Sequence, residues 1–259
     1  MFIIRRQIQT FAIALLIISG LACCNKEVET KKAVSVTIHG YNISDDSLEV
    51  SLDTVLFDKK TLAPNRQINF SMVYPYFPTQ KGATLHVTKP DGKDLIEQAV
   101  TFSNDQLEFF LPLVNINGKL LDVKPPLATD TTNKLGFYIH YTESNDSLDI
   151  LLYNPTSGQM VYLAEKVVPE TWVYTDYVPT EGFMDKNEVG ACIIYFFKAG
   201  SIEEFAFNND ETLSQVSAFG LFLPHSGYTG NKVQPYFITP STDGNQLDIV
   251  RLFPNTKKY

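Results

Sequence analysis

The chain has 259 residues, a formal net charge of −8 and a sequence pI of about 5.0. An acidic chain is repelled by the nucleic-acid backbone and by an anionic bilayer surface, so the charge argues against both as binding partners. Three cysteines are too few for a disulfide framework.

The N-terminus carries a targeting pattern. Two arginines precede an apolar run at residues 11–21, and a small residue then leads into Cys23 and Cys24. The run is too short to span a bilayer comfortably. This order resembles the signal peptide of bacterial lipoproteins, in which a cysteine is acylated and becomes the new N-terminus. We expect residues 1–23 to be removed and the lipid to tether the chain to the outer membrane.

The choice of acylated cysteine depends on the preceding residues. Cys24 is favoured because the aliphatic Leu21 stands three residues before it, whereas Cys23 has the better small residue, Ala22, directly before it. Cleavage after Ala22 by an ordinary signal peptidase and an uncleaved N-terminal span are the alternatives. Residues 24–33 are charged and read as a lipidated tether. Their acidic residues resemble export signals of surface lipoproteins in Bacteroidetes-type bacteria, so the protein is expected to face the periplasm or the exterior.

The rest of the chain has the composition of an all-β protein. Val, Ile, Thr, Tyr and Phe are abundant, turn signals recur regularly, and helical periodicity is missing after residue 24. These features are typical of β-sandwiches or barrels.

An internal repeat divides the chain into two copies. Residues 36–52 match residues 137–152, since each segment has an Ile-His strand followed by Asp-Ser-Leu. Residues 73–79 similarly resemble residues 173–180, and Phe109–Pro112 is similar to Leu221–Pro224. Several similar segments in the same order predict tandem domains.

We therefore predict two tandem immunoglobulin-like β-sandwich domains, at residues 34–123 and 134–259. Residues 124–133, rich in proline and threonine, form the linker between them. Because this linker is short, we expect the domains to lie close together.

The opening strands also resemble a known family. An Ile-His strand, a turn and a Leu-(Glu/Asp)-(Val/Ile)-x-Leu strand are similar to domain-of-unknown-function family 4397, which occurs as repeats in secreted bacterial proteins. The turn at residues 41–46 lacks the prolines of that family. The resemblance covers the first two strands of each copy and implies a fold and a location rather than an activity.

Alternation predicts which face of each strand is buried, because successive side chains of a strand point to opposite faces. The residues expected to point inward are Val34, Val36, Ile38, Leu48, Val50, Leu52, Ile68, Phe70, Met72, Tyr74, Tyr76, Phe137, Ile139, Tyr141, Leu148, Ile150 and Leu152.

Two histidines occupy the same position in the two copies. His39 and His140 fall on the polar face, and we expect cross-strand pairs of His39 with Glu49 and of His140 with Asp149. A metal or catalytic site would require a third ligand or a nucleophile, and none is nearby in the sequence. No metal or other cofactor is expected.

Aromatic residues raise the hypothesis of a sugar-binding site. Trp172 and Tyr174 align with Met72 and Tyr74, which predicts that both are core residues. Tyr228, in a glycine-containing loop, is the better candidate for a ligand-binding aromatic residue. Cys192 lies in an apolar run and is expected to be a buried hydrophobic residue.

Short Asp-Ser/Thr motifs raise a separate hypothesis. They resemble acceptor sites for protein O-glycosylation in Bacteroidetes, and the alternative is that Asp and Ser open a strand because they favour turns. The possible acceptors are Ser47, Thr54, Thr131 and Ser147.

Motifs for enzymatic chemistry are missing from the sequence: there is no Gly-x-Ser-x-Gly, no phosphate-binding glycine loop and no paired His-Glu metal motif. We expect a lipid-anchored envelope protein that acts as a non-catalytic binding, scaffold or adhesion module and not as an enzyme. Its expected partners are the membrane, through the lipid, and other outer-membrane proteins or glycans. The alternatives are a carbohydrate-binding accessory lipoprotein of a nutrient-uptake system and, less favoured, a hydrolase on a sandwich scaffold.

Overall fold

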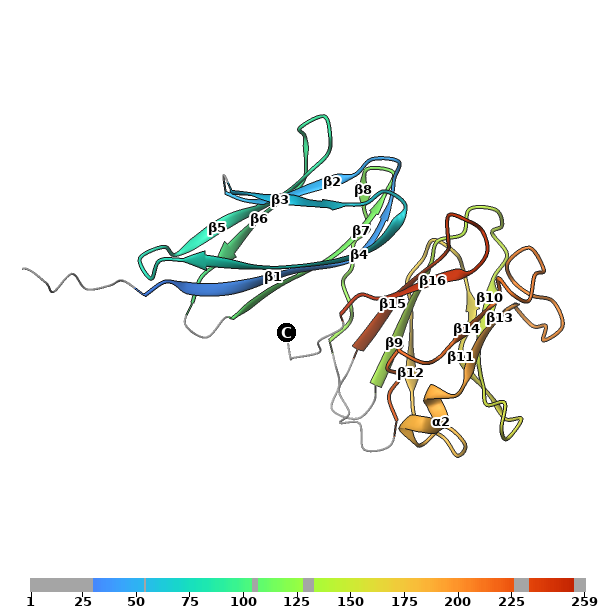
Figure 1. Cartoon of the computed structure of the whole chain (residues 1–259). Helices are drawn as coiled ribbons and strands as arrows, with labels where there is room; N and C mark the ends of the chain where they lie inside the picture. Colours follow the sequence, from blue (N-terminus) through green and yellow to red (C-terminus); the bar gives the residue numbers. More distant parts are fainter. Residues whose placement is uncertain (1–29, 54, 104–106, 128–132, 226–232, 254–259) are drawn as a thin grey trace, which may run out of the picture.

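The structure is a computed structural model that describes residues 30–53, 55–103, 107–127, 133–225 and 233–253. Over these ranges the chain is built from strands and one short helix, α2 (Lys186–Gly190), so the all-β prediction is confirmed (Figure 1). None of the described helices is both long enough and apolar enough to cross a membrane.

The first half of the chain forms two four-stranded sheets. Sheet A has the strand order β4 (Arg66–Tyr76), β1 (Lys32–Ile43), β7 (Glu108–Ile116), β8 (Lys119–Leu120). Sheet B has the order β3 (Val55–Leu62), β2 (Leu48–Leu52), β5 (Gly82–Thr88), β6 (Asp94–Thr101).

The second half forms two more sheets. Sheet C has the order β12 (Val173–Tyr177), β9 (Asn133–Ile139), β15 (Val233–Pro240), β16 (Leu247–Arg251). Sheet D has the order β11 (Met160–Val167), β10 (Leu148–Tyr153), β13 (Ile193–Lys198), β14 (Gln215–Ser217).

The two halves share one topology. In sheet A, β1 pairs antiparallel with β4 and parallel with β7. In sheet C, β9 pairs antiparallel with β12 and parallel with β15. Sheets B and D likewise place β2 and β10 at equivalent central positions. The repeat found in the sequence therefore corresponds to a repeated strand order.

Each half has its own hydrophobic core, to which both of its sheets contribute. Every residue predicted to point inward from the alternation belongs to one of these two cores or packs against it. The predicted burial of Cys192 is also confirmed, since its exposed fraction is 1%. Hence local alternation was sufficient to assign the faces of these strands.

The alignment of Trp172 and Tyr174 with core residues was wrong. Val173 lies opposite Phe137, just as Met72 lies opposite Val36 in the first half. Since Phe137 and Val36 are equivalent in the repeat, the counterpart of Met72 is Val173. A shift of one residue moves side chains to the other face of a strand. Trp172 and Tyr174 consequently lie on the outer face of sheet C.

The predicted correspondence of Phe109–Pro112 with Leu221–Pro224 was also wrong. Phe109 lies opposite Val36 in β7, and Tyr236 lies opposite Phe137 in β15, so β15 supplies the equivalent segment. Residues 221–224 belong to no strand. The apparent similarity there comes from composition and not from position in the fold.

A third hydrophobic cluster joins the two halves. It is built from the outer faces of sheets A and C and from the segment that connects them (Figure 1). Its buried members are Tyr41, Val114, Tyr138, Phe237, Val250 and Leu252, and the residues packed against them include Ile43, Ile116, Leu121, Val123, Trp172 and Phe253. We call this cluster the junction. Sheet C is therefore covered on both faces, whereas sheet D lies on the side away from the first half (Figure 1).

Candidate functional site

Hydrogen bonds cross the junction beside its apolar cluster. The Tyr41 hydroxyl donates to Oδ2 of Asp248 over 2.7 Å, and burial followed by this carboxylate raises the pKa of Tyr41 far above its usual value. Nδ1 of His39 lies 2.9 Å from the carbonyl oxygen of Arg251. The indole N–H of Trp172 donates to the carbonyl oxygen of Asp122 over 3.1 Å. These bonds fix the relative position of the two halves.

Glu170 is the centre of a polar group at the edge of the junction. Its carboxylate accepts hydrogen bonds from the Tyr138 hydroxyl and from the backbone N–H of Tyr141, each over 3.0 Å. Nδ1 of His140 lies 2.8 Å from Oε1, at ion-pair distance but without the direction of a hydrogen bond. Burial, and then the Glu170 carboxylate, raises the pKa of Tyr138, so this phenol is a poor nucleophile. The hydrogen bonds of this group stabilise the fold at the edge of the junction.

Both predicted histidine pairs were wrong. His39 is in sheet A and Glu49 in sheet B, so the two residues are not on paired strands. His140 contacts Glu170 instead of Asp149. Asp149 is 3% exposed and accepts hydrogen bonds from the backbone N–H groups of Lys166 and Gly200, over 2.7 and 2.8 Å. Its carboxylate therefore connects β10 to β11 and to the turn that follows β13.

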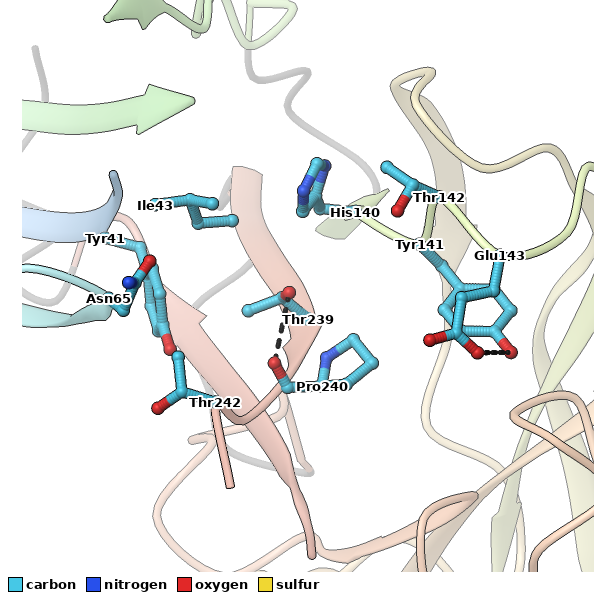
Figure 2. Close-up of a pocket in the computed structure, with 10 residues that line it drawn as sticks. All are labelled: Tyr41, Ile43, Asn65, His140, Tyr141, Thr142, Glu143, Thr239, Pro240 and Thr242. Carbon is cyan, nitrogen blue, oxygen red and sulfur yellow. Dashed lines mark hydrogen bonds between the residues drawn. The ribbon is translucent and has the colours of Figure 1, made fainter. Parts of the chain in front are cut away.

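A cleft of about 190 Å³ opens next to the junction, and both halves line it (Figure 2). Tyr41, Ile43 and Asn65 come from the first half. The second half contributes His140, Tyr141, Thr142, Glu143, Thr239, Pro240 and Thr242. The volume is smaller than the roughly 300–1,000 Å³ typical of small-molecule sites. No group of three His, Cys, Asp or Glu side chains suited to a metal occurs among the described residues.

The outer face of sheet D carries a row of aromatic rings. Tyr153, Tyr195 and Phe205 are half-buried, Tyr162 is 46% exposed, and Phe197 is 7% exposed. Ring centroids are 6.0 Å apart for Tyr153 and Tyr195, 5.7 Å for Tyr195 and Phe197, and 5.2 Å for Phe197 and Phe205. We call these five residues the aromatic face. It covers the side of sheet D opposite the core of the second half.

The first half provides an internal comparison for this face. Tyr195 lies opposite Leu151 in sheet D, and at the equivalent place in sheet B His86 lies opposite Ser51. His86 in turn contacts the Asp94 carboxylate, with 3.1 Å between Nδ1 and Oδ2. Two halves with the same strand order thus present a polar outer face on one sheet and an aromatic outer face on the other. The topology therefore does not require the aromatic rings.

This face was not predicted from the sequence, because the run that contains Tyr195 reads as a uniformly buried strand. The alternation of side chains along β10 and β13 nevertheless indicates which residues point outward. Tyr153 and Tyr195 alternate with the inward-facing Leu152, Ile194 and Phe196, so their parity is the outward one.

The other predicted site residues are only partly covered by the structure. Ser47 and Ser147 are half-buried and stand immediately before β2 and β10, at equivalent places in the two halves. The remaining candidates lie outside the described residues: Cys23, Cys24, Thr54, Thr131 and Tyr228.

No family model and no curated protein matches the chain. Among solved structures it is similar to the Bacillus anthracis TIE protein, with 9% sequence identity and a TM-score of 0.19. The match covers 81% of this chain and 34% of that one, so the chain spans about a third of the length of that structure.

Proposed function

We propose that this chain is a lipid-anchored protein of the cell envelope that acts as a non-catalytic binding module. The observation that carries the binding role is the aromatic face. Partly exposed rings such as those of Tyr153, Tyr162 and Tyr195 contribute less to stability than buried rings do, and the described side chains of sheet B in the first half include no Phe, Tyr or Trp. Exposed aromatic clusters of this kind mark interaction surfaces.

In this proposal each half is an immunoglobulin-like β-sandwich and the two arose by duplication. The shared strand order and the separate cores support the duplication. The similarity of the opening strands to domain-of-unknown-function family 4397 is part of the same proposal. The junction then presents the aromatic face in a fixed orientation relative to the N-terminal tether.

Retention on envelope fragments tests the binding role. Purified protein is incubated with fragments from cells that lack it, and the fraction retained is compared with that of a Tyr162→Thr, Tyr195→Thr variant. Thr preserves strand propensity while removing the rings. We expect retention to fall several-fold, and His86→Thr, at the position equivalent to Tyr195, to leave it unchanged. Equal retention of the wild type and the double variant would contradict the role of this face.

The anchor is tested by the intact mass of the native protein. We expect a mass that corresponds to cleavage before Cys24 plus acyl chains, and loss of the acyl mass in Cys24→Ala. If Cys23→Ala loses it instead, Cys23 is the acylated residue. The same spectrum tests glycosylation at Ser47 and Ser147, because a mass equal to polypeptide plus acyl chains alone would exclude it.

A carbohydrate-binding role in nutrient uptake is the second candidate, and the tyrosines of the aromatic face favour it. Crosslinking and affinity purification of the native lipoprotein, read by mass spectrometry, tests this role. Recovery of an outer-membrane transporter would support it, whereas recovery of surface-structure components would favour a scaffold or adhesion role.

A further inference from the structure

We propose that the aromatic face binds an uncharged polysaccharide, which lies across the strands of sheet D. This inference rests on the proposed binding function and names the ligand class for the same surface. Three properties of the face support it: the chemistry of its rings, the charges around its tyrosines and its rigidity.

The rings have the chemistry that sugars require. A tyrosine offers a flat apolar surface and a hydroxyl that both donates and accepts hydrogen bonds. The C–H faces of pyranose rings stack on such surfaces, while sugar hydroxyls bond to the phenol oxygens. Tyr153, Tyr162 and Tyr195 present this combination on three neighbouring strands.

The charges near the tyrosines select against anionic ligands. The residues paired with the tyrosines across these strands are uncharged: Leu151 lies opposite Tyr162 and Tyr195, Tyr153 lies opposite Met160 and Ile193, and Tyr195 also lies opposite Gln215. The charge that acts on Tyr195 is negative, since burial and then the Glu211 carboxylate raise the pKa of this phenol. Asp149, further along β10, is buried and accepts hydrogen bonds from two backbone N–H groups. The strands carry two lysines, Lys166 in β11 and Lys198 in β13, but Nζ of Lys198 lies 2.9 Å from Oε2 of Glu204, and a polyanion would be repelled by a chain of net charge −8.

The geometry fits an extended chain. Tyr162 and Tyr195 both lie opposite Leu151, on either side of β10. Strands are about 4.8 Å apart, so the backbones of the two tyrosines are separated by about 10 Å across the sheet. This distance spans more than one sugar ring. Because the rings are held on paired strands, binding requires little ordering of the protein, which favours affinity.

Affinity gel electrophoresis of the full-length lipoprotein in detergent tests the inference. The gels contain starch, xylan, galactomannan, hydroxyethyl cellulose or a neutral β-glucan, and one contains the polyanion alginate. We expect at least one neutral polymer to retard the protein and alginate not to do so. The Tyr162→Thr, Tyr195→Thr variant should bind the retarding polymer about tenfold or more weakly, and His86→Thr should bind it as the wild type does.

The single change Tyr162→Thr, at a 46% exposed position, provides a second variant that retains the fold if the double variant does not. Retardation that is insensitive to both variants would overturn the site. If no neutral polymer retards the protein but the double variant still loses retention on envelope fragments, the ligand is not a glycan and the binding function stands. If retention is also unaffected, both proposals fail.

Discussion

The hydroxyl of Tyr41 donates a hydrogen bond to the carboxylate of Asp248, and this bond joins two halves of the chain that have separate cores. Tyr41 is 1% exposed and Asp248 is half-buried, so removal of the Tyr41 hydroxyl leaves the Asp248 carboxylate without this donor. We expect Tyr41→Phe to lower the free energy of unfolding by about 1.5–3 kcal/mol, as for a hydrogen bond to a charged group. Urea denaturation measures this change.

Tyr162→Phe is the matched control for that substitution. The Tyr162 side chain is 46% exposed on sheet D, and the change should alter the free energy of unfolding by no more than about 0.5 kcal/mol. Equal effects of the two substitutions would show that the bond across the junction contributes nothing particular to stability.

His39 should make stability depend on pH. Burial lowers its pKa below the usual value of 6.5, although the carbonyl oxygen of Arg251 and the side chain of Asn69 partly oppose this. As the pH falls through 6.5, the unfolded chain takes up a proton that the folded protein resists, so the free energy of unfolding decreases. We expect His39→Gln to lose this component, and urea denaturation of both proteins between pH 8 and pH 5 measures the difference.

Other titrating groups cancel in that comparison because both proteins share them. The free energy of unfolding of the wild type should therefore decrease relative to that of His39→Gln as the pH falls from 7 towards 5. A gap that stays constant over this range would be inconsistent with burial of a neutral His39.

Gly40 stands where a side chain cannot fit. A Cβ atom at this position would lie 1.7 Å from the carbonyl oxygen of Leu113, on the neighbouring strand β7. We expect Gly40→Ala to force β1 and β7 apart and to cost about 1–3 kcal/mol or more in the free energy of unfolding. The thermal denaturation midpoint should fall accordingly.

Gly190→Ala provides the control, because a Cβ at this position in α2 would make only an ordinary contact, 3.8 Å from Phe219. Alanine also has the higher helix propensity, so this variant should be neutral or slightly stabilised. A Gly40→Ala protein as stable as Gly190→Ala would contradict the close approach of β1 and β7.

Cys192 should be unreactive in the folded protein. Its side chain is buried, and burial, followed by the charge of Glu188, raises the pKa of the thiol to about 11. The thiolate is the reactive form, so iodoacetamide at pH 8 should label Cys192 only after unfolding in urea. Peptide mass spectrometry distinguishes it from Cys23 and Cys24. Rapid labelling of Cys192 in the native protein would show that the thiol is accessible.

Alternation along the chain by itself determined the all-β class, the inward faces of the strands in the first half and the repeat of Ile38-His39 at Ile139-His140. These features depend on neighbouring residues, because the side-chain period of a strand is two wherever the strand lies. The repeat was visible because both copies keep the same residue types at the start of the fold.

Only the tertiary structure decided the positions of Trp172 and Tyr195. The register of β12 against β9 placed Trp172 on the outer face of sheet C, where it packs at the junction. The parity of Tyr195 was readable from the sequence, but not which outer faces would be covered. Sheet C packs against the first half and sheet D does not. Strand register and contacts between sheets depend on residues far apart in sequence, so local periodicity cannot predict them.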